Sequence, residues 1–416
     1  MSRSTLYKVA VAGVIAPLLL TAACGGSTKG SSSGGGSTGG SGSGKPIVLG
    51  TSLSLTGPLG QFGIDLQAGY KEKVDELNAA GGLRVGGSKR PVTLTVLDNR
   101  SDPNTASQQI RELVLKDSAA ALLGACTPPI NTPEALAAEQ QKVPYIATCN
   151  PVLAFQAGNP SGWIYAWDAF FSEQDQATGA AKGLALAKSN KKVALFTDTE
   201  PDGVAERPVY KQAFTAAGLD VVGDYTFPVG TTDFSSFING AKSKGAQLVA
   251  VQMIPPDGIA LWKQMKALNF KPVQAFATKA ASNGGWPQAL GPIAEGTIAD
   301  AFWSPATGKA NSQALATSLA GKVPADLPDQ SIAVLGYTIC AVITDAIKTA
   351  GGTSPSAFNT AIGKTNADYP SGNITFNSKH TATTPYLVTQ WQGGKSVVIL
   401  PTTAGVTFED PATGLQ

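Results

Sequence analysis

Residues 47–82 read IVLGTSLSLTGPLGQFGIDLQAGYKEKVDELNAAGG. The stretch opens with a run of apolar and β-branched residues, Ile47–Leu53, which is typical of a buried strand. Apolar residues then recur at helical spacing over 61–80, and Gly81 and Gly82 follow as a helix stop. A strand, a short turn and a helix in this order predict the first unit of an α/β fold.

The same alternation of strand and helix continues along the chain. Because it implies a parallel sheet covered on both faces and restarts after an interval, we predict two doubly wound lobes. About 370 residues follow the N-terminal region, too many for one ordinary core, and ligands of such folds bind beyond the carboxyl ends of the strands. The expected strands are 92–97, 119–123, 143–147, 191–196, 220–227, 248–253 and 273–277, and the expected helices are 104–116, 133–141, 204–217, 233–243 and 258–268.

The N-terminus has the pattern of a secretory signal. Arg3 and Lys8 precede an apolar run, 9–20, and small residues lead to Cys24. A cysteine at the cut resembles the bacterial lipobox, so we expect residues 1–23 to be a lipoprotein signal peptide and Cys24 to carry lipid. An ordinary signal peptide with an incidental cysteine is the alternative. The chain is therefore expected to be exported and anchored to the outer face of the cell membrane.

The segment after Cys24 is a predicted tether. Residues 25–44 are nearly all Gly, Ser and Thr, which bury too little apolar surface to offset the entropy of ordering. We therefore assign residues 24–45 to the lipidated cysteine and a flexible linker.

Composition excludes several functions. The chain has 31 basic and 29 acidic residues, and removal of Arg3 and Lys8 leaves 29 of each. A neutral chain without a basic block is a poor candidate for binding nucleic acid. His380 is the single histidine, so histidine metal clusters and triads have no second histidine. We predict no catalytic residue, no metal site and no cofactor, and we expect a monomer.

Several motifs identify a family. Residues 53–63, Gly69 and residues 78–82 resemble the opening of type I periplasmic binding proteins of the branched-chain amino acid group. The same family is matched further on at 97–103, 196–198, 336–337, 345–346 and 350–352.

The resemblance implies a fold and a function. The fold would have two lobes joined by a three-stranded hinge, which close around a small solute that is passed to a membrane ABC permease. Lobe 1 would comprise residues 46–167 plus 303–380, and lobe 2 would comprise residues 168–302 plus 381–416, with crossings near Asp168, Phe302 and Thr381.

The loops after two strands of the first lobe are candidate carboxylate sites. Thr132 is a plausible N-cap with Pro133 at the first helical position, and free N–H groups at a helix start favour an anion. A merely well-capped helix is the alternative. The resemblance favours a ligand there and implies contacts from these loops, mainly through backbone groups in the second: Cys126, Thr127, Thr148, Cys149 and Asn150.

Other expected contacts come from elsewhere in the chain. The resemblance places Phe62 against the solute, and Trp167 and Phe170 belong to an aromatic stretch that could equally be core. Ile254 follows a strand of the second lobe and is also assigned to the site. We therefore expect the solute to have an apolar or aromatic body.

Two positions depart from the family pattern. Lys279 lies near the place of the acid that holds an α-ammonium in amino-acid-binding members, which argues against an ordinary α-amino acid because a buried ammonium needs a paired acid. Asp202 replaces an expected tyrosine and could recognise a cation or hydroxyls. The alternative for Asp202 is a solvated turn residue.

The cysteines give a separate prediction. Cys126 and Cys149 follow consecutive strands that should be neighbours, at a separation that a disulfide can span in an oxidising compartment. Two small buried thiols are the alternative. Cys340 lies in an apolar helical stretch and is expected to be a buried free thiol.

These observations favour a solute receptor of an ABC importer that captures a small carboxylate- or amide-bearing molecule. Two alternatives remain from the sequence: a sensory lipoprotein that reports to a membrane receptor, and a lipid-anchored hydrolase. The motif Ser189–Lys192 has the spacing of a serine and lysine acylase but lacks its companion motifs.

Overall fold

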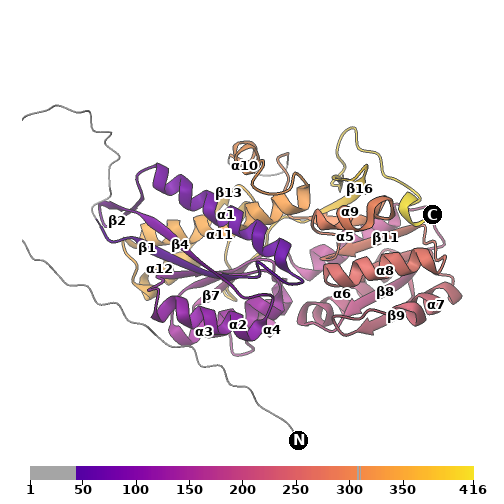
Figure 1. Cartoon of the computed structure of the whole chain (residues 1–416), viewed down its shortest axis with the longest axis horizontal. Helices are drawn as coiled ribbons and strands as arrows, with labels where there is room; N and C mark the ends of the chain where they lie inside the picture. Colours follow the sequence, from indigo (N-terminus) through magenta and orange to yellow (C-terminus); the bar gives the residue numbers. More distant parts are fainter. Residues whose placement is uncertain (1–43, 307–308, 310) are drawn as a thin grey trace, which may run out of the picture. The chain divides into compact units, whose positions relative to one another are not determined.

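A computed structural model describes residues 44–306, 309 and 311–416. The expected signal peptide, Cys24 and nearly all of the linker lie outside these residues. The described part of the chain forms two lobes, each built on one large sheet (Figure 1).

The first lobe contains a six-stranded parallel sheet in the order β15-β7-β6-β5-β1-β4. Alternate residues of β5 enter different apolar clusters: Leu123 packs with the cluster of α1 and α11, and Leu122 packs with that of α2 and α3. The sheet is therefore covered on both faces, as the sequence predicts. Its elements are β1 (Ile47–Leu53), β4 (Val92–Asp98), β5 (Ala121–Leu123), β6 (Tyr145–Ala147), β7 (Ala166–Ala169), β15 (Thr381–Ala382), α1 (Gly60–Ala79), α2 (Pro103–Leu115), α3 (Pro128–Gln141), α4 (Val152–Ala157), α10 (Ser312–Leu319), α11 (Leu327–Ala350) and α12 (Pro355–Gly363), with hairpins β2 (Leu83–Val85)/β3 (Ser88–Arg90) and β13 (Asn366–Tyr369)/β14 (Gly372–Thr375).

The second lobe contains a seven-stranded sheet in the order β17-β16-β12-β11-β10-β8-β9. Neighbouring residues Leu195 and Phe196 of β8 enter opposite clusters, one with α5 and α6 and the other with α7 and α8. The late strands β16 and β17 pair antiparallel with each other and with β12, so this sheet is mixed at one edge. Its elements are β8 (Lys192–Asp198), β9 (Asp220–Phe227), β10 (Leu248–Gln252), β11 (Gln274–Thr278), β12 (Ile298–Ala301), β16 (Leu387–Gln392), β17 (Lys395–Leu400), α5 (Glu173–Ala185), α6 (Pro201–Ala216), α7 (Ser235–Ser243), α8 (Pro255–Ala267), α9 (Gly285–Leu290) and the 3₁₀ helices Gly291–Ala294 and Thr413–Leu415.

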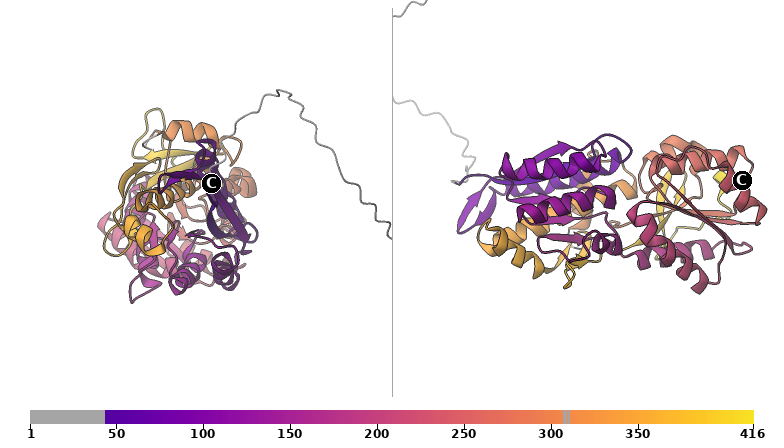
Figure 2. Two further views of the ribbon diagram at one scale, coloured as in Figure 1. Left: turned by 90° about the vertical axis from the view of Figure 1, so that its left-hand side faces the viewer. Right: turned by 90° about the horizontal axis from the view of Figure 1, so that it is seen from below.

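Three segments connect the two sheets. They run from β7 to α5, from β12 to α10 and from β15 to β16, so each lobe is built from separate stretches of chain. Helix α1 accordingly packs against the late helix α11, and Figure 2 shows early, indigo to purple segments and late, orange segments together in the first lobe. The predicted class, two doubly wound lobes with a three-stranded connection, is confirmed.

The contact between α1 and α11 is unusually close. A Cβ atom at Gly69 would lie 1.8 Å from the Ala333 carbonyl oxygen, so only glycine allows the two backbones to approach this far. Within the described residues, α11 is the helix long and apolar enough to cross a membrane, but 83% of its most apolar window is buried inside the protein. It is therefore the central core helix of the first lobe.

The start of helix α3 differs from the prediction. The helix begins at Pro128, five residues before the expected start at Pro133, which lies inside it. Proline is favoured at the first helical position, and the sequence offers three prolines within six residues, so the rule selected the wrong one. Thr132 is therefore a helical residue and not an N-cap.

Candidate functional site

A cavity lies beyond the carboxyl ends of strands from both sheets, where a doubly wound fold binds its ligands. Its free volume is about 410 Å³, including space that opens to solvent. One wall is mainly apolar and the other is rich in charged and amide groups. The lining residues are Phe62, Cys126, Thr127, Cys149, Pro151, Phe170, Phe171, Gln176, Asp202, Glu206, Gln252, Thr278, Lys279, Ser282, Phe302 and Ile332.

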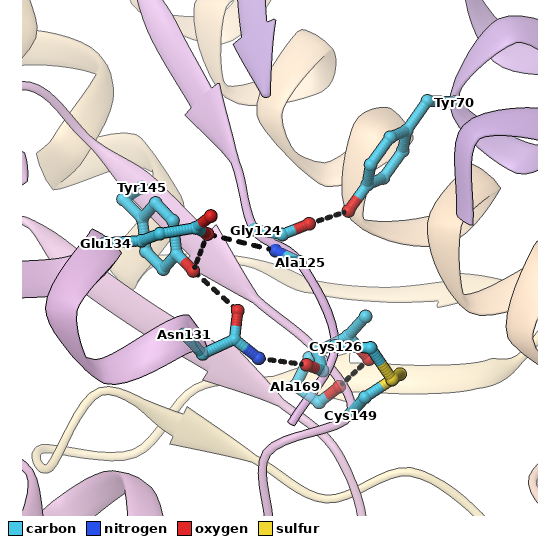
Figure 3. Close-up of a disulfide and its surroundings, with 10 residues drawn as sticks. Tyr70, Gly124, Ala125, Cys126, Asn131, Glu134, Tyr145, Cys149 and Ala169 are labelled. Atoms are coloured by element: carbon cyan, nitrogen blue, oxygen red, sulfur yellow. Dashed lines mark hydrogen bonds between the residues drawn. A yellow bond between two sulfur atoms is a disulfide. The ribbon is translucent and has the colours of Figure 1, made fainter. Parts of the chain in front are cut away.

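A disulfide forms part of the first wall. Cys126 and Cys149 are bonded, with their Cα atoms 4.8 Å apart, which confirms the predicted bridge (Figure 3). Cys340 is a buried free cysteine, as predicted. The bridge joins the loops that follow β5 and β6, so the two loops behind the cavity are covalently tied.

A buried hydrogen-bond network holds the same two loops from behind (Figure 3). The Tyr145 hydroxyl lies 2.6 Å from Asn131 Oδ1 and 3.0 Å from Glu134 Oε2, and the Ala125 N–H donates to the same Glu134 oxygen. Burial raises the pKa of Glu134 to about 8, so this carboxyl is largely protonated at neutral pH. The Asn131 amide donates to the Thr148 carbonyl and so links α3 to the second loop.

Thr127 is the polar group of this wall. Its backbone φ is 76°, and its Oγ1 is buried without a hydrogen-bond partner among the described residues. The predicted anion site at the start of α3 is wrong, because Pro128 and Pro129 have no N–H. The next N–H groups, of Ile130 and Asn131, donate to the Thr127 carbonyl.

The other predicted residues of the second loop lie behind the cavity surface. The Thr148 hydroxyl donates to the Ala169 carbonyl and ties β6 to β7. Asn150 is fully buried, and neither of its amide atoms has a partner in the described structure. Neither residue lines the cavity, whereas Cys149, between them, does.

Aromatic rings form the apolar part of the cavity. Phe62 lines it as expected from the resemblance, together with Phe170, whose ring centroid lies 4.2 Å from Phe171 and 4.7 Å from Phe302. Ile254 is buried in the same apolar cluster but does not line the cavity.

Trp167 is not part of the cavity, contrary to the prediction. Its ring stacks on His380 at 3.6 Å, and its Nε1 donates to Asn359 Oδ1. The alternative assignment of this aromatic residue to the core is therefore the correct one. Alternation along a strand shows which residues share a face of the sheet, but it does not show whether that face meets the ligand or the core.

The opposite wall is built around Asp202 and Lys279. Asp202 is in the first turn of α6 and only 3% exposed, so the alternative of a solvated turn residue is wrong. Lys279 Nζ lies 2.9 Å from Asp202 Oδ2, 2.6 Å from Glu200 Oε2 and 3.9 Å from Asp198 Oδ2. Three carboxyl groups therefore surround one ammonium.

Burial and neighbouring charges shift the pKa values of this cluster. Burial lowers the pKa of Lys279, but the charges of Asp202, Asp198 and Glu200 outweigh it and raise that pKa well above its ordinary value. Burial raises the pKa of Asp198 to about 8, with Lys279 opposing the rise. The three carboxyl oxygens lie within 4.8 Å of one another, but the ammonium already supplies the cation that such a cluster would otherwise attract.

Polar residues of neighbouring strands complete this wall. Gln252, the last residue of β10, donates from Nε2 to Asp202 Oδ2 at 2.8 Å. Thr278, the last residue of β11, donates to Asp300 Oδ2 at 2.5 Å, and Ser282 also bonds to Asp300. The Asp300 carboxylate therefore holds both hydroxyl groups in place.

Some of these residues had a signal in the sequence and others did not. Gln252 and Thr278 are polar residues at the ends of apolar strands, a position where a doubly wound fold places its site. Glu206 lies one helical turn after Asp202, and Gln176 lies in α5, which the sequence analysis did not predict. No local pattern distinguishes either from an exposed helical residue.

Comparison with known proteins agrees with the fold and the position of the cavity. The sequence profile of the periplasmic binding protein family matches residues 46–395. The chain is 25% identical over 356 residues to the Leu/Ile/Val-binding protein BraC3 of Rhizobium johnstonii, covering 84% of this chain and 93% of that protein.

Two solved structures share the fold. A leucine-binding protein from Thermotoga maritima has a TM-score of 0.72 at 23% identity, with 85% of this chain and 97% of that chain covered. A solute-binding protein of R. palustris in complex with 4-hydroxybenzoate has a TM-score of 0.71 at 21% identity, with 88% and 98% covered. The chain belongs to the periplasmic binding protein family, and its fold is that of the type I members.

Proposed function

We propose that this chain is the substrate-binding lipoprotein of an ABC importer. It captures one small solute in the cavity between its lobes and delivers it to a membrane permease, without chemical change to the solute. One observation carries the proposal: a cavity beyond the carboxyl ends of both sheets combines aromatic walls with buried polar atoms that have no partner in the described structure, namely Thr127 Oγ1, Asp202 Oδ1 and Gln252 Oε1. A buried polar atom normally has a hydrogen-bond partner, so a ligand that supplies these partners is favoured there.

The walls indicate what kind of solute fits. Phe62, Phe170 and Phe302 favour a flat or branched apolar body. The hydroxyl of Thr127 can donate to a carboxylate or amide oxygen at the first wall. We therefore propose a small carboxylate- or amide-bearing molecule with an apolar or aromatic body.

The site is tested by finding the solute and then removing its contacts. The full chain is purified, denatured and analysed for released small molecules by mass spectrometry, and the candidates are measured by calorimetry. Thr127→Ala should weaken binding by about 1 kcal/mol, the usual contribution of one hydrogen bond. Thr317→Ala, which removes an exposed hydroxyl in α10, is the matched control and should have no effect.

Phe62→Ala should also weaken binding, because the ring forms part of the apolar wall. Unchanged affinity in both Phe62→Ala and Thr127→Ala would reject this placement of the site. Recovery of the solute unaltered after long incubation is the expected result for a receptor; conversion to a product would favour a hydrolase.

The anchor is tested separately. Cys24→Ala should move the protein from the membrane fraction to the medium, and the mass of the native N-terminal peptide should show attached lipid. A deletion of the neighbouring permease should abolish uptake of the labelled solute while leaving its binding unchanged. Continued uptake would instead favour a sensory role.

A further inference from the structure

The charged wall of the cavity contains hydrogen-bond acceptors that are buried and unused. Asp202 is 3% exposed and Gln252 is 1% exposed, and both line the cavity. One oxygen of each, Asp202 Oδ1 and Gln252 Oε1, has no partner within the described residues. Carboxylate and amide oxygens accept hydrogen bonds and do not donate them, so these two positions require a donor.

Lys279 does not act as a free cation in this cavity. Its ammonium has three protons, and carboxyl oxygens of Glu200 and Asp202 lie at 2.6 and 2.9 Å, with Asp198 at 3.9 Å. A solute carboxylate would have to compete with these carboxyl groups for the same ammonium. Lys279 is therefore bound internally, although its position in the sequence suggested direct contact with the solute.

The same contacts orient Asp202. Its Oδ2 accepts from both Lys279 Nζ and Gln252 Nε2, at 2.9 and 2.8 Å. With Oδ2 held by two donors, the carboxylate cannot turn freely, and Oδ1 remains available. The Gln252 amide is oriented by the same bond, which leaves its Oε1 as the second available acceptor.

Glu206 is a further acid of this wall. Glu206 also lines the cavity, and its carboxyl lies 2.9 Å from the amide of Gln176. Burial, and then the charge of Asp202, raise the pKa of Glu206 well above its usual value. The carboxyl groups of Asp198, Glu200 and Asp202 all lie within 3.9 Å of the single ammonium of Lys279, so acidic groups outnumber cations in this wall and it favours a positively charged group.

We propose that Asp202 and Gln252 form the specificity-determining pair of the cavity and bind a nitrogen donor of the solute, an ammonium or an amidinium, while Lys279 is a positioning residue that orients Asp202. The inference rests on the proposed function, because it names the chemical class of the solute for the same cavity. The inference also revises the interpretation of Lys279 from sequence, which argued against an ammonium in the solute. Asp202, in the first turn of α6, supplies an acid for a cationic group instead.

The test compares solutes that differ in one group. The full chain is titrated by calorimetry with isoleucine and 2-hydroxy-3-methylpentanoate, with phenylalanine and 3-phenyllactate, and with 4-(aminomethyl)benzoate and benzoate. In whichever pairs bind, the ammonium member should bind about tenfold more tightly or better, because a buried acceptor left without its donor is costly. Equal or tighter binding of the member without nitrogen would overturn the inference and leave the proposed function intact.

Variants separate recognition from positioning. Asp202→Asn should reduce the ratio of the two affinities to near one, whereas the matched control Asp224→Asn, which removes an acid paired with Arg207 and Lys211 outside the cavity, should preserve it. Lys279→Met should lower the ratio, and Lys279→Arg should restore part of it. A purely structural Lys279 would change the melting temperature and leave the ratio unchanged.

Two further outcomes also decide the matter. If Lys279→Met selectively weakens the members without nitrogen, Lys279 is an anion receptor and the inference is wrong. If none of the six compounds binds and no small molecule is released from the purified chain, the proposed function fails, and the inference with it.

Discussion

Removal of the disulfide should lower the free energy of unfolding by an amount set by the number of residues between the two cysteines. Cys126 and Cys149 are 23 residues apart in sequence. For a loop of this length the chain-entropy relation gives about 3 kcal/mol of stabilisation at 25 °C, because the bond restricts the unfolded chain. The folded loops are also held by the Tyr145 network, so the native structure should persist without the bond.

The assay is urea unfolding followed by tryptophan fluorescence and by circular dichroism. Cys126→Ser, Cys149→Ser and the double variant should each lose about the same 3 kcal/mol, since any one of them removes the whole bond. Reducing agent should lower the stability of the original chain to the same level and leave the double variant unchanged, which makes the double variant the matched control. Solute affinity should also fall, because both cysteines line the cavity.

The reasoning would be refuted if reducing agent did not change the unfolding of the original chain, or if the costs of the two single changes added in the double variant. A count of free thiols in the denatured, unreduced chain gives an independent check. With Cys24 lipidated, Cys340 alone should react.

Three further predictions concern the core, the pH dependence and the corrected aromatic residue. Gly69→Ala should destabilise the protein by about 3 kcal/mol or more, because the new Cβ would overlap the Ala333 carbonyl oxygen. The control Gly60→Ala should cost little, because the nearest atom would lie 3.4 Å from its Cβ. Equal unfolding midpoints of the two variants would contradict this prediction. Burial raises the pKa of the Asp329 carboxyl to about 6, above its usual value of 3.8. The stability that this carboxyl contributes is therefore present below about pH 4 and is lost as the pH rises through about 6, and at about 1.4 kcal/mol per pKa unit the loss is at most about 3 kcal/mol. Melting curves of Asp329→Asn recorded across this pH range should lack the loss. Trp167→Phe should lower stability by about 1 kcal/mol through the lost bond to Asn359 without changing solute affinity, and a calorimetric titration that showed weaker binding would return Trp167 to the site.

Much of the fold could be predicted from the sequence because the buried apolar residues recur with the spacing of strands and helices. Strands β1 and β9 have the expected bounds: β1 is largely apolar and β-branched, and β9 contains the strand-forming residues Val, Tyr, Thr and Phe. Short elements at the connections were not predicted. For example, β7 is a strand of four residues, AWDA, and its place between β6 and β15 depends on pairing that no local pattern shows.

The candidate site was predictable where it follows the end of a strand. Cys126 and Cys149 could be paired because parallel strands end at the same edge of a sheet. The charge of the second wall could not be predicted in the same way. Lys279 is far in sequence from Glu200 and Asp202, and only the assembled lobe shows that carboxyl groups surround the ammonium of this lysine.

Three residues of the cavity have strained backbones, and each is stabilised by a different interaction. Thr127, Cys149 and Lys279 have φ values of 76°, 53° and 60°, in the left-handed region that non-glycine residues rarely adopt. The Thr127 N–H donates to the Cys149 carbonyl, the disulfide ties both loops, and the carboxyl groups around Lys279 hold its side chain. Because each wall is fixed within its own lobe, the polar atoms facing the cavity are already oriented before a solute arrives, and this reduces the entropy lost on binding. Selectivity then depends on the fixed acceptors of Asp202 and Gln252 rather than on rearrangement of either wall.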